Sequence, residues 1–389
     1  MSHLATVPST LTMPVLSALL LFSATVAAPT SGLNKPQPKP AIAKPKLGAA
    51  DLFGAGIPET PVPAGYGRYC SLSYPSGGWA FDWGSVNDDP CATMLASSPG
   101  GTIARAGLYS LSGDNNVVVR CGGEVWLYGL PGTQALRTAI DAHRSKTHCV
   151  YTVAPRVLPI FDRPHAADES KMKRANGFDF ARGYTLESNA GTQQSCLNSE
   201  GNSCSFNGHD GYDWSMPAGT TIRSVAAGKV LVARDRDVQS WLNKGCAGTP
   251  PSPNSSRFQK EVYVVHRVGR GDYAEVFVTY YAHLSTMDVS NGQTVTRSQK
   301  LGEAGTTGCS TGDHLHFEVT RFTNTAAAYR RPYQVPTTED YDRTSMIDPY
   351  GFTWHGRTNF DPWAWRAYAS GDGALSIDLW RSGQRPYRW

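Results

Sequence analysis

The sequence predicts a mostly β protein, because runs of β-branched and aromatic residues are separated by short segments rich in glycine and proline. Residues 276–284 read VFVTYYAHL, and residues 314–319 read HLHFEV with strict alternation of polar and apolar side chains. Residues of these types favour strands, and strict alternation is typical of a strand with one buried face. Residues 221–232 add a strand, a turn and a second strand.

The strand expected at residues 314–319 places two histidines on one face. His314 and His316 share that face with Glu318, because residues two apart in a strand point the same way. The alternate positions are apolar and suit a core: Leu315, Phe317 and Val319. A glycine-rich loop leads into this strand, so its polar face can open into a site. Two imidazoles held on one rigid element suit a metal ion.

A second cluster contains His209 and Asp213 in the sequence HDGYDW. Glycine and proline residues surround it and disfavour a helix, so a strand or turn is expected. One histidine and one aspartate from here, with one histidine from the later strand, make a three-ligand set for zinc that leaves a fourth position for water. His283 ends the run that begins at residue 276. At the end of a strand it is well placed to enter the same site.

Three motifs in this order resemble the lysostaphin-type (LytM-like) zinc metalloendopeptidases, which cut peptidoglycan peptides. They are His-x-x-x-Asp at residues 209–213, Tyr-Ala-His-Leu at residues 281–284 and His-x-His at residues 314–316. The resemblance covers about residues 177–354, which is under half of the chain. It implies a mostly antiparallel β-sheet domain that cleaves peptide bonds in peptidoglycan stem or cross-bridge peptides.

The resemblance also implies roles for five residues. One Zn²⁺ ion would be bound by His209, Asp213 and His316, while His283 and His314 would take a proton from the attacking water and stabilise the oxyanion. The alternative is a family member that has lost its metal and only binds the cell wall or activates an amidase. All five motif residues are intact, which favours the enzyme.

Two departures from the family's pattern concern the surroundings of these residues. Asp313 stands where the family often has a proline or a small residue. Some members bring a tyrosine to the oxyanion from just before the first motif, and residues 203–207 contain none.

The N-terminal residues of the chain indicate export. Residues 1–28 contain a short apolar stretch followed by small residues, which is typical of a signal peptide. Residues 29–64 are rich in proline, alanine and lysine and predict an extended basic linker. We therefore expect a secreted or periplasmic monomer with no stable membrane anchor after signal removal. Its substrate would be bacterial peptidoglycan and not nucleic acid, although the net charge of +4 identifies no partner by itself.

An even number of cysteines in an exported chain predicts disulfides. Pairs Cys196–Cys204 and Cys246–Cys309 are expected, the second beside the His-x-His loop. The pairing of the first four stays open. The eight cysteines are Cys70, Cys91, Cys121, Cys149, Cys196, Cys204, Cys246 and Cys309.

The remaining segments complete the domain organisation. Residues 65–155 predict a small disulfide-stapled α+β domain, with a hairpin over residues 117–128 and a helix starting at Thr133. This domain could bind the wall, cover the peptidase cleft as a pro-domain or stabilise the fold. Residues 156–175 are expected to be a linker, residues 176–354 the peptidase domain, and residues 355–389 an aromatic tail packed on it.

Two further expectations follow from these assignments. If the N-terminal domain blocks the cleft, a chain that starts near Lys173 should be more active than the full chain. Histidines outside the motifs are expected to be structural, and they are His143, His148, His165, His266 and His355.

Overall fold

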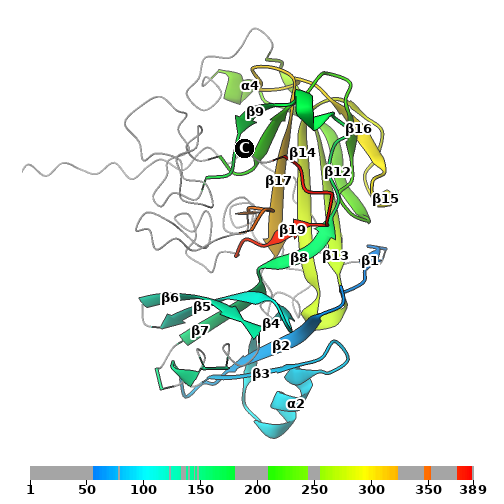
Figure 1. The fold of residues 1–389 in the computed structure, drawn as a ribbon. Coiled ribbons are helices and arrows are strands. Elements are labelled where there is room, and N and C mark those ends of the chain that lie inside the picture. Colours follow the sequence, from blue (N-terminus) through cyan, green and yellow to red (C-terminus); the bar gives the residue numbers. More distant parts are fainter. Residues whose placement is uncertain are drawn as a thin grey trace, which may run out of the picture. The chain divides into compact units, whose positions relative to one another are not determined.

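A computed structural model describes residues 56–77, 79–121, 124–132, 137–138, 141–143, 145–146, 149–179, 209–243, 255–322, 346–351 and 375–387 (Figure 1). The fold is mostly antiparallel β, as the sequence predicts. Several predictions fall outside the described residues: the predicted signal peptide, the predicted linker up to residue 55, Thr133, Cys196, Cys204, Cys246, His148 and tail residues 352–374. Within the described residues, no helix is both long and apolar enough to cross a membrane.

Two three-stranded antiparallel sheets make up the N-terminal part of the described chain. One has the order β3-β2-β4 and the other the order β6-β5-β7. The hairpin predicted over residues 117–128 is confirmed by the pairing of β5 with β6. The strands are β2 (Tyr66–Ser73), β3 (Trp79–Gly84), β4 (Thr102–Ser110), β5 (Asp114–Cys121), β6 (Glu124–Pro131) and β7 (Cys149–Pro155).

Helix α2 (Pro90–Ser97) packs on the first of these sheets. Its N-cap is Asp89, whose side chain accepts a hydrogen bond from the Ala92 amide, and Pro90 occupies the first turn, where no backbone donor is needed. A disulfide joins Cys91 on the helix to Cys70 on β2. This cross-link and the cap together hold a short helix that would be marginal by itself.

The C-terminal part contains an 11-stranded sheet with the main order β15-β12-β13-β14-β17-β10-β9 (Figure 1). Adjacent pairs on this path are antiparallel. The strands on the path are β9 (Lys173–Asn176), β10 (Tyr212–Ser215), β12 (Gly228–Asp237), β13 (Phe258–Val268), β14 (Glu275–Met287), β15 (Thr294–Val295) and β17 (His314–Phe322).

Short elements complete the structure. Strand β1 pairs with β13, β11 with β16, and β18 with β17, while β8 and β19 form a separate parallel pair. Their bounds are β1 (Glu59–Thr60), β8 (Val157–Phe161), β11 (Thr221–Arg223), β16 (Lys300–Ala304), β18 (Met346–Ile347), β19 (Asp378–Trp380), α4 (Gln239–Leu242), η1 (Glu169–Lys171) and η2 (Gly271–Tyr273).

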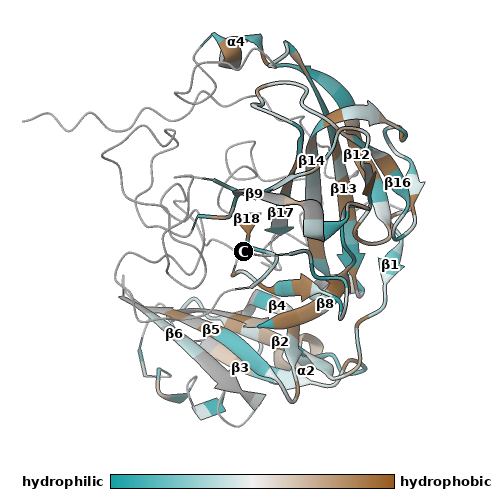
Figure 2. Cartoon of the chain, turned by 45° about the horizontal axis from the view of Figure 1, so that its top comes forward, coloured by the Kyte–Doolittle hydropathy of each residue, from teal (hydrophilic) through white to brown (hydrophobic). Residues whose placement is uncertain are grey.

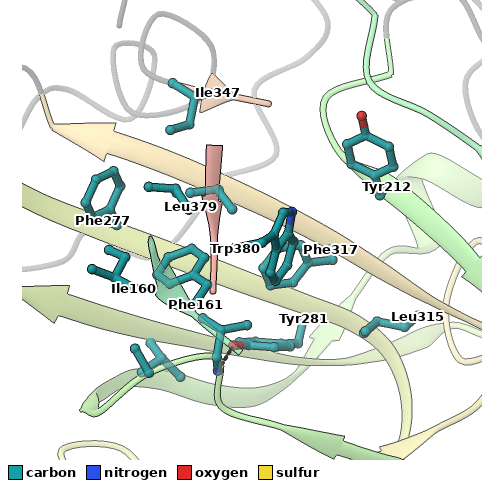
Figure 3. Close-up of a cluster of buried hydrophobic side chains, with 14 of the residues drawn as sticks. Ile160, Phe161, Tyr212, Phe277, Tyr281, Leu315, Phe317, Ile347, Leu379 and Trp380 are labelled. Carbon is teal, nitrogen blue, oxygen red and sulfur yellow. Dashed lines mark hydrogen bonds between the residues drawn. The ribbon is translucent and has the colours of Figure 1, made fainter. Parts of the chain in front are cut away.

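The main hydrophobic core lies on the face of the large sheet opposite the paired histidines. Leu315, Phe317 and Val319 are fully buried there, as the alternation in the sequence predicts. Strands β8 and β19 cover this face with apolar side chains, among them Phe161 and Trp380 (Figure 3). Apolar residues colour much of β8 and of the central strands β13 and β14 (Figure 2). The burial of Trp380 shows that the described end of the tail packs on the sheet.

Part of the linker predicted over residues 156–175 is instead regular, hydrogen-bonded structure. Strand β8 lies within it. The amide of Arg223 on β11 donates to the Pro164 carbonyl at 2.7 Å, and the amide of Ala166 donates to Thr221 at 3.0 Å. Arg163 also pairs with Glu169 at 3.2 Å. The stretch at residues 163–171 is therefore bound to the sheet.

The N-terminal sheets contact the hairpin between β13 and β14. The Tyr273 hydroxyl at its tip hydrogen-bonds the Asp89 carboxylate and accepts the Cys91 amide at 2.8 Å, at the N-terminus of α2. Leu108 of β4 and Ala154 of β7 belong to the same core cluster as Phe317. These contacts support a stabilising role for the N-terminal sheets.

Two histidines expected to be structural are buried in the described core. Nδ1 of His266 lies 3.0 Å from the Ala227 carbonyl, and its Nε2 lies 2.8 Å from the Thr279 hydroxyl. Burial lowers the pKa of His266 to about 4 and that of His165 to about 3. The folded state therefore holds both rings neutral.

We predict that acid destabilises the fold through His266. Its folded-state pKa of about 4 lies below the ordinary 6.5, so between these values the unfolded chain binds the extra proton. Stability is therefore lost as the pH falls from 6.5 to 4, by an amount on the order of 3 kcal/mol. Urea unfolding at pH 7 and pH 4 should show a smaller loss for His266→Gln than for the unchanged chain. Equal losses would contradict the prediction.

Candidate metal centre and active site

Three neighbouring strands bring the predicted site residues together. In the register of the sheet, Asp213 on β10 lies opposite His316 on β17, and His316 lies opposite Ala282 on β14. His314 is two residues from His316 and therefore shares its face. The site is thus assembled by strand pairing between segments that are far apart in the sequence.

The three predicted ligands form one compact group. The ligand atoms of His209, Asp213 and His316 all lie within 4.8 Å of one another, and none of the three side chains is exposed. Nε2 of His209 is 3.2 Å from Oδ2 of Asp213, and Nδ1 of His316 is 2.7 Å from Oδ1. The carboxylate therefore lies between two imidazole nitrogens, as expected of a shared cation site.

The other ring nitrogens of both ligand histidines are already engaged. His209 donates from Nδ1 to the Gly177 carbonyl at 2.9 Å, and His316 donates from Nε2 to Glu318 at 2.9 Å. Such outer hydrogen bonds fix which nitrogen faces a metal and hold the ring in place. Asn176 also donates to Asp213 at 2.8 Å. Two imidazoles and one carboxylate, each oriented by a neighbour, fit a zinc ion with one open position.

Electrostatics in this group follow from burial and opposite charge. Burial alone would lower the pKa of His316, but Asp213 and Glu318 raise it to about 10. For His209, Asp213 likewise outweighs burial and raises the pKa. Burial opposes ionisation of Asp213, yet His209 and His316 hold its pKa well below the usual range. The cluster therefore keeps Asp213 ionised, as a ligand carboxylate must be.

His314 and His283 lie beside this group with their rings 4.5 Å apart. Nδ1 of His314 donates to the Gly312 carbonyl at 2.7 Å, and Nδ1 of His283 donates to the Thr307 carbonyl at 2.7 Å. Nε2 of each ring is left for the site, and that of His314 is 3.7 Å from Asp213. Burial, reinforced by the charges of His314 and His316, lowers the pKa of His283 well below 6.5. The ring is therefore held neutral, and Nε2 is its unprotonated nitrogen because Nδ1 donates to Thr307.

The position of His283 differs from the expected strand end. Strand β14 continues to Met287, and its register with β13 shifts between the pairs Lys260–Leu284 and Val262–Tyr281. His283 sits in this irregularity with φ +62°, in the left-handed region that non-glycine residues rarely adopt. A bulge re-aims side chains, and here it allows a strand interior to present His283 beside His314.

We predict that His283 is held in a strained backbone conformation for function. His283→Ala and His283→Gly both remove the imidazole, but only glycine adopts this backbone without strain. The glycine variant should therefore be more stable than the alanine variant by about 1 kcal/mol, which reverses the usual order in a strand. Urea unfolding of the two proteins measures this difference. A more stable alanine variant would contradict the prediction.

Several supporting residues could not be identified from the sequence. Thr307 accepts from His283 with its carbonyl, while its hydroxyl donates to Leu284 at 2.7 Å and accepts the Lys260 amide at 3.0 Å. Gly177 and Asn176 belong to a segment outside the three motifs. The glycine-rich loop at residues 305–312 was the one sequence signal for these supporting residues. It indicated close backbone packing but not which residue would contact His283.

Other sequence expectations concern the rim of the site. Cys309 is disulfide-bonded, as the even number of cysteines predicts, whereas its predicted partner Cys246 lies outside the described residues and that pairing stays a prediction. Asp313 is exposed next to His314. Glu318 contacts His316, and Asp210 lies 4.0 Å from the same ring. Asp210, His316 and Glu318 form a second possible ligand group that shares His316 with the first.

The model of peptidase family M23 matches residues 207–328, which include all five predicted site residues. The chain contains an M23 peptidase domain. The resemblance predicted from the three ordered motifs is thereby confirmed. The match begins just before His209 and ends after β17, so it covers the strands that carry the site.

Curated proteins similar to the M23 domain include two named endopeptidases. Peptidoglycan DD-endopeptidase ShyA of Vibrio cholerae serotype O1 is 34% identical over 111 residues, which are 28% of this chain and 20% of that protein. Glycyl-glycine endopeptidase ALE-1 of Staphylococcus capitis is 31% identical over 146 residues, which are 37% of this chain and 34% of that protein. The chain thus spans only 20% to 34% of the length of these relatives.

Solved structures also match parts of the chain. The catalytic domain of the antimicrobial peptidase lysostaphin from Staphylococcus simulans has 24% identity, covers 39% of this chain and 84% of that chain, and gives a TM-score of 0.24. A zinc containing peptidase from Vibrio cholerae has 17% identity, covers 65% of this chain and 75% of that chain, and gives a TM-score of 0.27.

Proposed function

We propose that the protein is an exported zinc metalloendopeptidase that hydrolyses peptide bonds in peptidoglycan. The observation that carries the proposal is the buried group of His209, Asp213 and His316 beside two further histidines in an M23 domain. Its relatives ShyA and ALE-1 are named as endopeptidases of peptidoglycan and of glycyl-glycine bonds. Export is supported by the signal-like sequence at residues 1–28 and by the Cys70–Cys91 disulfide.

The residues divide into ligands and proton carriers. His209, Asp213 and His316 would hold the zinc ion, which supplies Lewis-acid polarisation of the scissile carbonyl and activation of water. Asp213 contributes a single negative charge, so the zinc ion together with its three ligands would keep a net positive charge. The hydrogen bonds that His209 and His316 donate to Gly177 and Glu318 keep the ligand rings oriented.

His283 and His314 are suited to proton transfer because each has one nitrogen committed to a backbone carbonyl. The neutral His283 can accept the proton of the attacking water at Nε2 and later deliver a proton to the leaving amine. His314, next to Asp213, presents Nε2 to the site, and in its doubly protonated form it can donate a hydrogen bond from this atom to the developing oxyanion. Their ring separation of 4.5 Å allows both to reach one tetrahedral centre.

The test is hydrolysis of purified cell walls by the full chain. Zinc should be present at about one equivalent, wall turbidity should fall, and mass spectrometry should find new peptide termini. Removal of the metal with a chelator should stop the reaction, and zinc should restore it. Wall binding without any new termini at full zinc loading would instead support the non-catalytic wall-binding or amidase-activating alternative.

A further inference from the structure

A row of side chains runs from the metal group across the sheet to β12. In the register of the strands, His316 on β17 faces Ala282 on β14, and Arg234 on β12 faces Glu261 on β13. Tyr280, two residues before Ala282, hydrogen-bonds Glu261 at 2.7 Å and lies with its ring centroid 5.9 Å from that of His316. The residues around Glu261 therefore lie on the same sheet face as the metal group.

Glu261 is a fully buried carboxylate whose two oxygens are both occupied. Oε1 accepts Arg234 Nε at 2.7 Å. Oε2 accepts the Tyr280 hydroxyl at 2.7 Å and Gln259 Nε2 at 3.2 Å, and Arg236 Nε lies 3.2 Å from it. A buried charge needs such partners, and two guanidinium groups contact this single carboxylate. One carboxylate against two guanidinium groups leaves a net positive charge at the β12 end of the row.

Arg234 holds donors that Glu261 does not use. Its Nε makes the contact with Glu261, while its Nη2 is buried and has no hydrogen-bond partner in the part of the chain that the structure describes. The side chain is 29% exposed. A guanidinium group presents its N–H donors as a planar fork that matches a carboxylate. Glu261 engages Nε, and the unpaired Nη2 of this partly exposed side chain is a donor left for a ligand.

We propose that Arg234, oriented by Glu261, binds a carboxylate of the substrate peptide. The inference rests on the proposed function, because the ligand is the peptide whose scissile bond lies at the metal group. A peptide laid along the row from His316 to Arg234 would carry this carboxylate away from the reacting bond. Arg234 would therefore determine which peptides are bound productively, and it would take no part in the bond cleavage.

The distance along the row sets the position of the carboxylate. Three strand spacings of about 4.8 Å separate β17 from β12, which gives about 14 Å between the backbones of His316 and Arg234. The arginine side chain shortens this span from its own end. An extended peptide advances about 3.3 Å per residue, so the carboxylate should lie about two to four residues from the scissile bond.

The experiment uses synthetic wall peptides in which one carboxylate, two to four residues from the scissile bond, is either free or amidated. Binding to the full chain is measured by calorimetry after zinc removal, so that the readout does not depend on hydrolysis. The free carboxylate should bind about 10-fold to 100-fold more tightly than the amide at one of these positions, as expected of a charge-assisted pair. Arg234→Gln should reduce this ratio to near one.

Matched variants separate recognition from folding. Arg257→Gln removes the same charge from an exposed pair with Asp237 and should keep the ratio of the unchanged chain. Arg234→Lys keeps the charge and the contact with Glu261 but loses the fork, so it should give an intermediate ratio. Equal binding of free and amidated peptides by the unchanged chain would overturn the proposal. Discrimination in binding without hydrolysis by the zinc-loaded chain would instead reject the proposed peptidase function.

Discussion

Replacement of any of the three predicted ligands should yield protein that is poor in zinc and inactive. His209→Ala, Asp213→Ala and His316→Ala each leave only two ligands, and two ligands bind zinc weakly. Asp213 should have the largest effect because it lies between His209 Nε2 and His316 Nδ1 and carries the group's negative charge. Metal analysis of the purified variants, together with wall hydrolysis, measures both losses.

The matched controls are His283→Ala and His314→Ala. These rings donate to the carbonyls of Thr307 and Gly312 and are not part of the three-residue group, so zinc content should stay near one equivalent. Loss of a general acid or base should lower the rate by about 10²-fold to 10⁴-fold. If His314→Ala lost zinc while His316→Ala kept it, the two roles would be reversed. Unchanged metal content in all five variants would reject the zinc site itself.

That these site residues meet could be expected from the sequence, in part from local spacing and in part from family resemblance. Alternation in a strand puts His314 and His316 on one face wherever the strand pairs, and the buried Phe317 fixes which face points away from the core. The order of the motifs added His209 and Asp213 through family resemblance. These predictions depend little on how distant segments meet.

Features that depend on pairing between distant strands could not be predicted in this way. The bulge at His283 arises from the register of β13 against β14, and neither strand alone shows it. The carbonyl that holds His283 belongs to Thr307, in a loop whose path is fixed by Lys260 and Leu284. Arg234 and Glu261 similarly become neighbours only through the pairing of β12 with β13.

The prediction of a linker over residues 156–175 was wrong at β8, and the reason is physical. Its composition favours a linker, with proline, charged residues and only one short apolar run. The run VLPIF becomes strand β8 because β19, near the other end of the chain, pairs with it. Burial by a remote partner leaves no local periodicity, so the core role of Phe161 is visible only in the folded structure.

This finding reverses the result expected for a chain that starts at Lys173. Such a chain lacks β8, whose Leu158, Ile160 and Phe161 are buried in the main core against Phe277 and Trp380. Removal of one large buried side chain costs about 2–5 kcal/mol, whereas a whole domain is stable by about 5–15 kcal/mol. Loss of three should leave the chain unfolded or aggregated, without the gain in activity that a removed inhibitor would give.

A chain that starts at Arg156 is the informative comparison, because it lacks β1–β7 and α2 but retains β8 and its pairing with β19. It should unfold cooperatively and bind zinc, although at lower stability, since the Tyr273 hydroxyl loses its partners at the N-terminus of α2.

Phe161→Ala in the full chain should cost about 3–5 kcal/mol in urea unfolding, which tests the packing of β8 in the core without truncation. A monomeric, cooperatively folded chain starting at Lys173 would show that β8 is dispensable. Higher wall hydrolysis by the chain starting at Arg156 than by the full chain would assign inhibition to the N-terminal sheets. Equal or lower hydrolysis would favour a stabilising role for these sheets, because their described contacts are with the β13–β14 hairpin and the core.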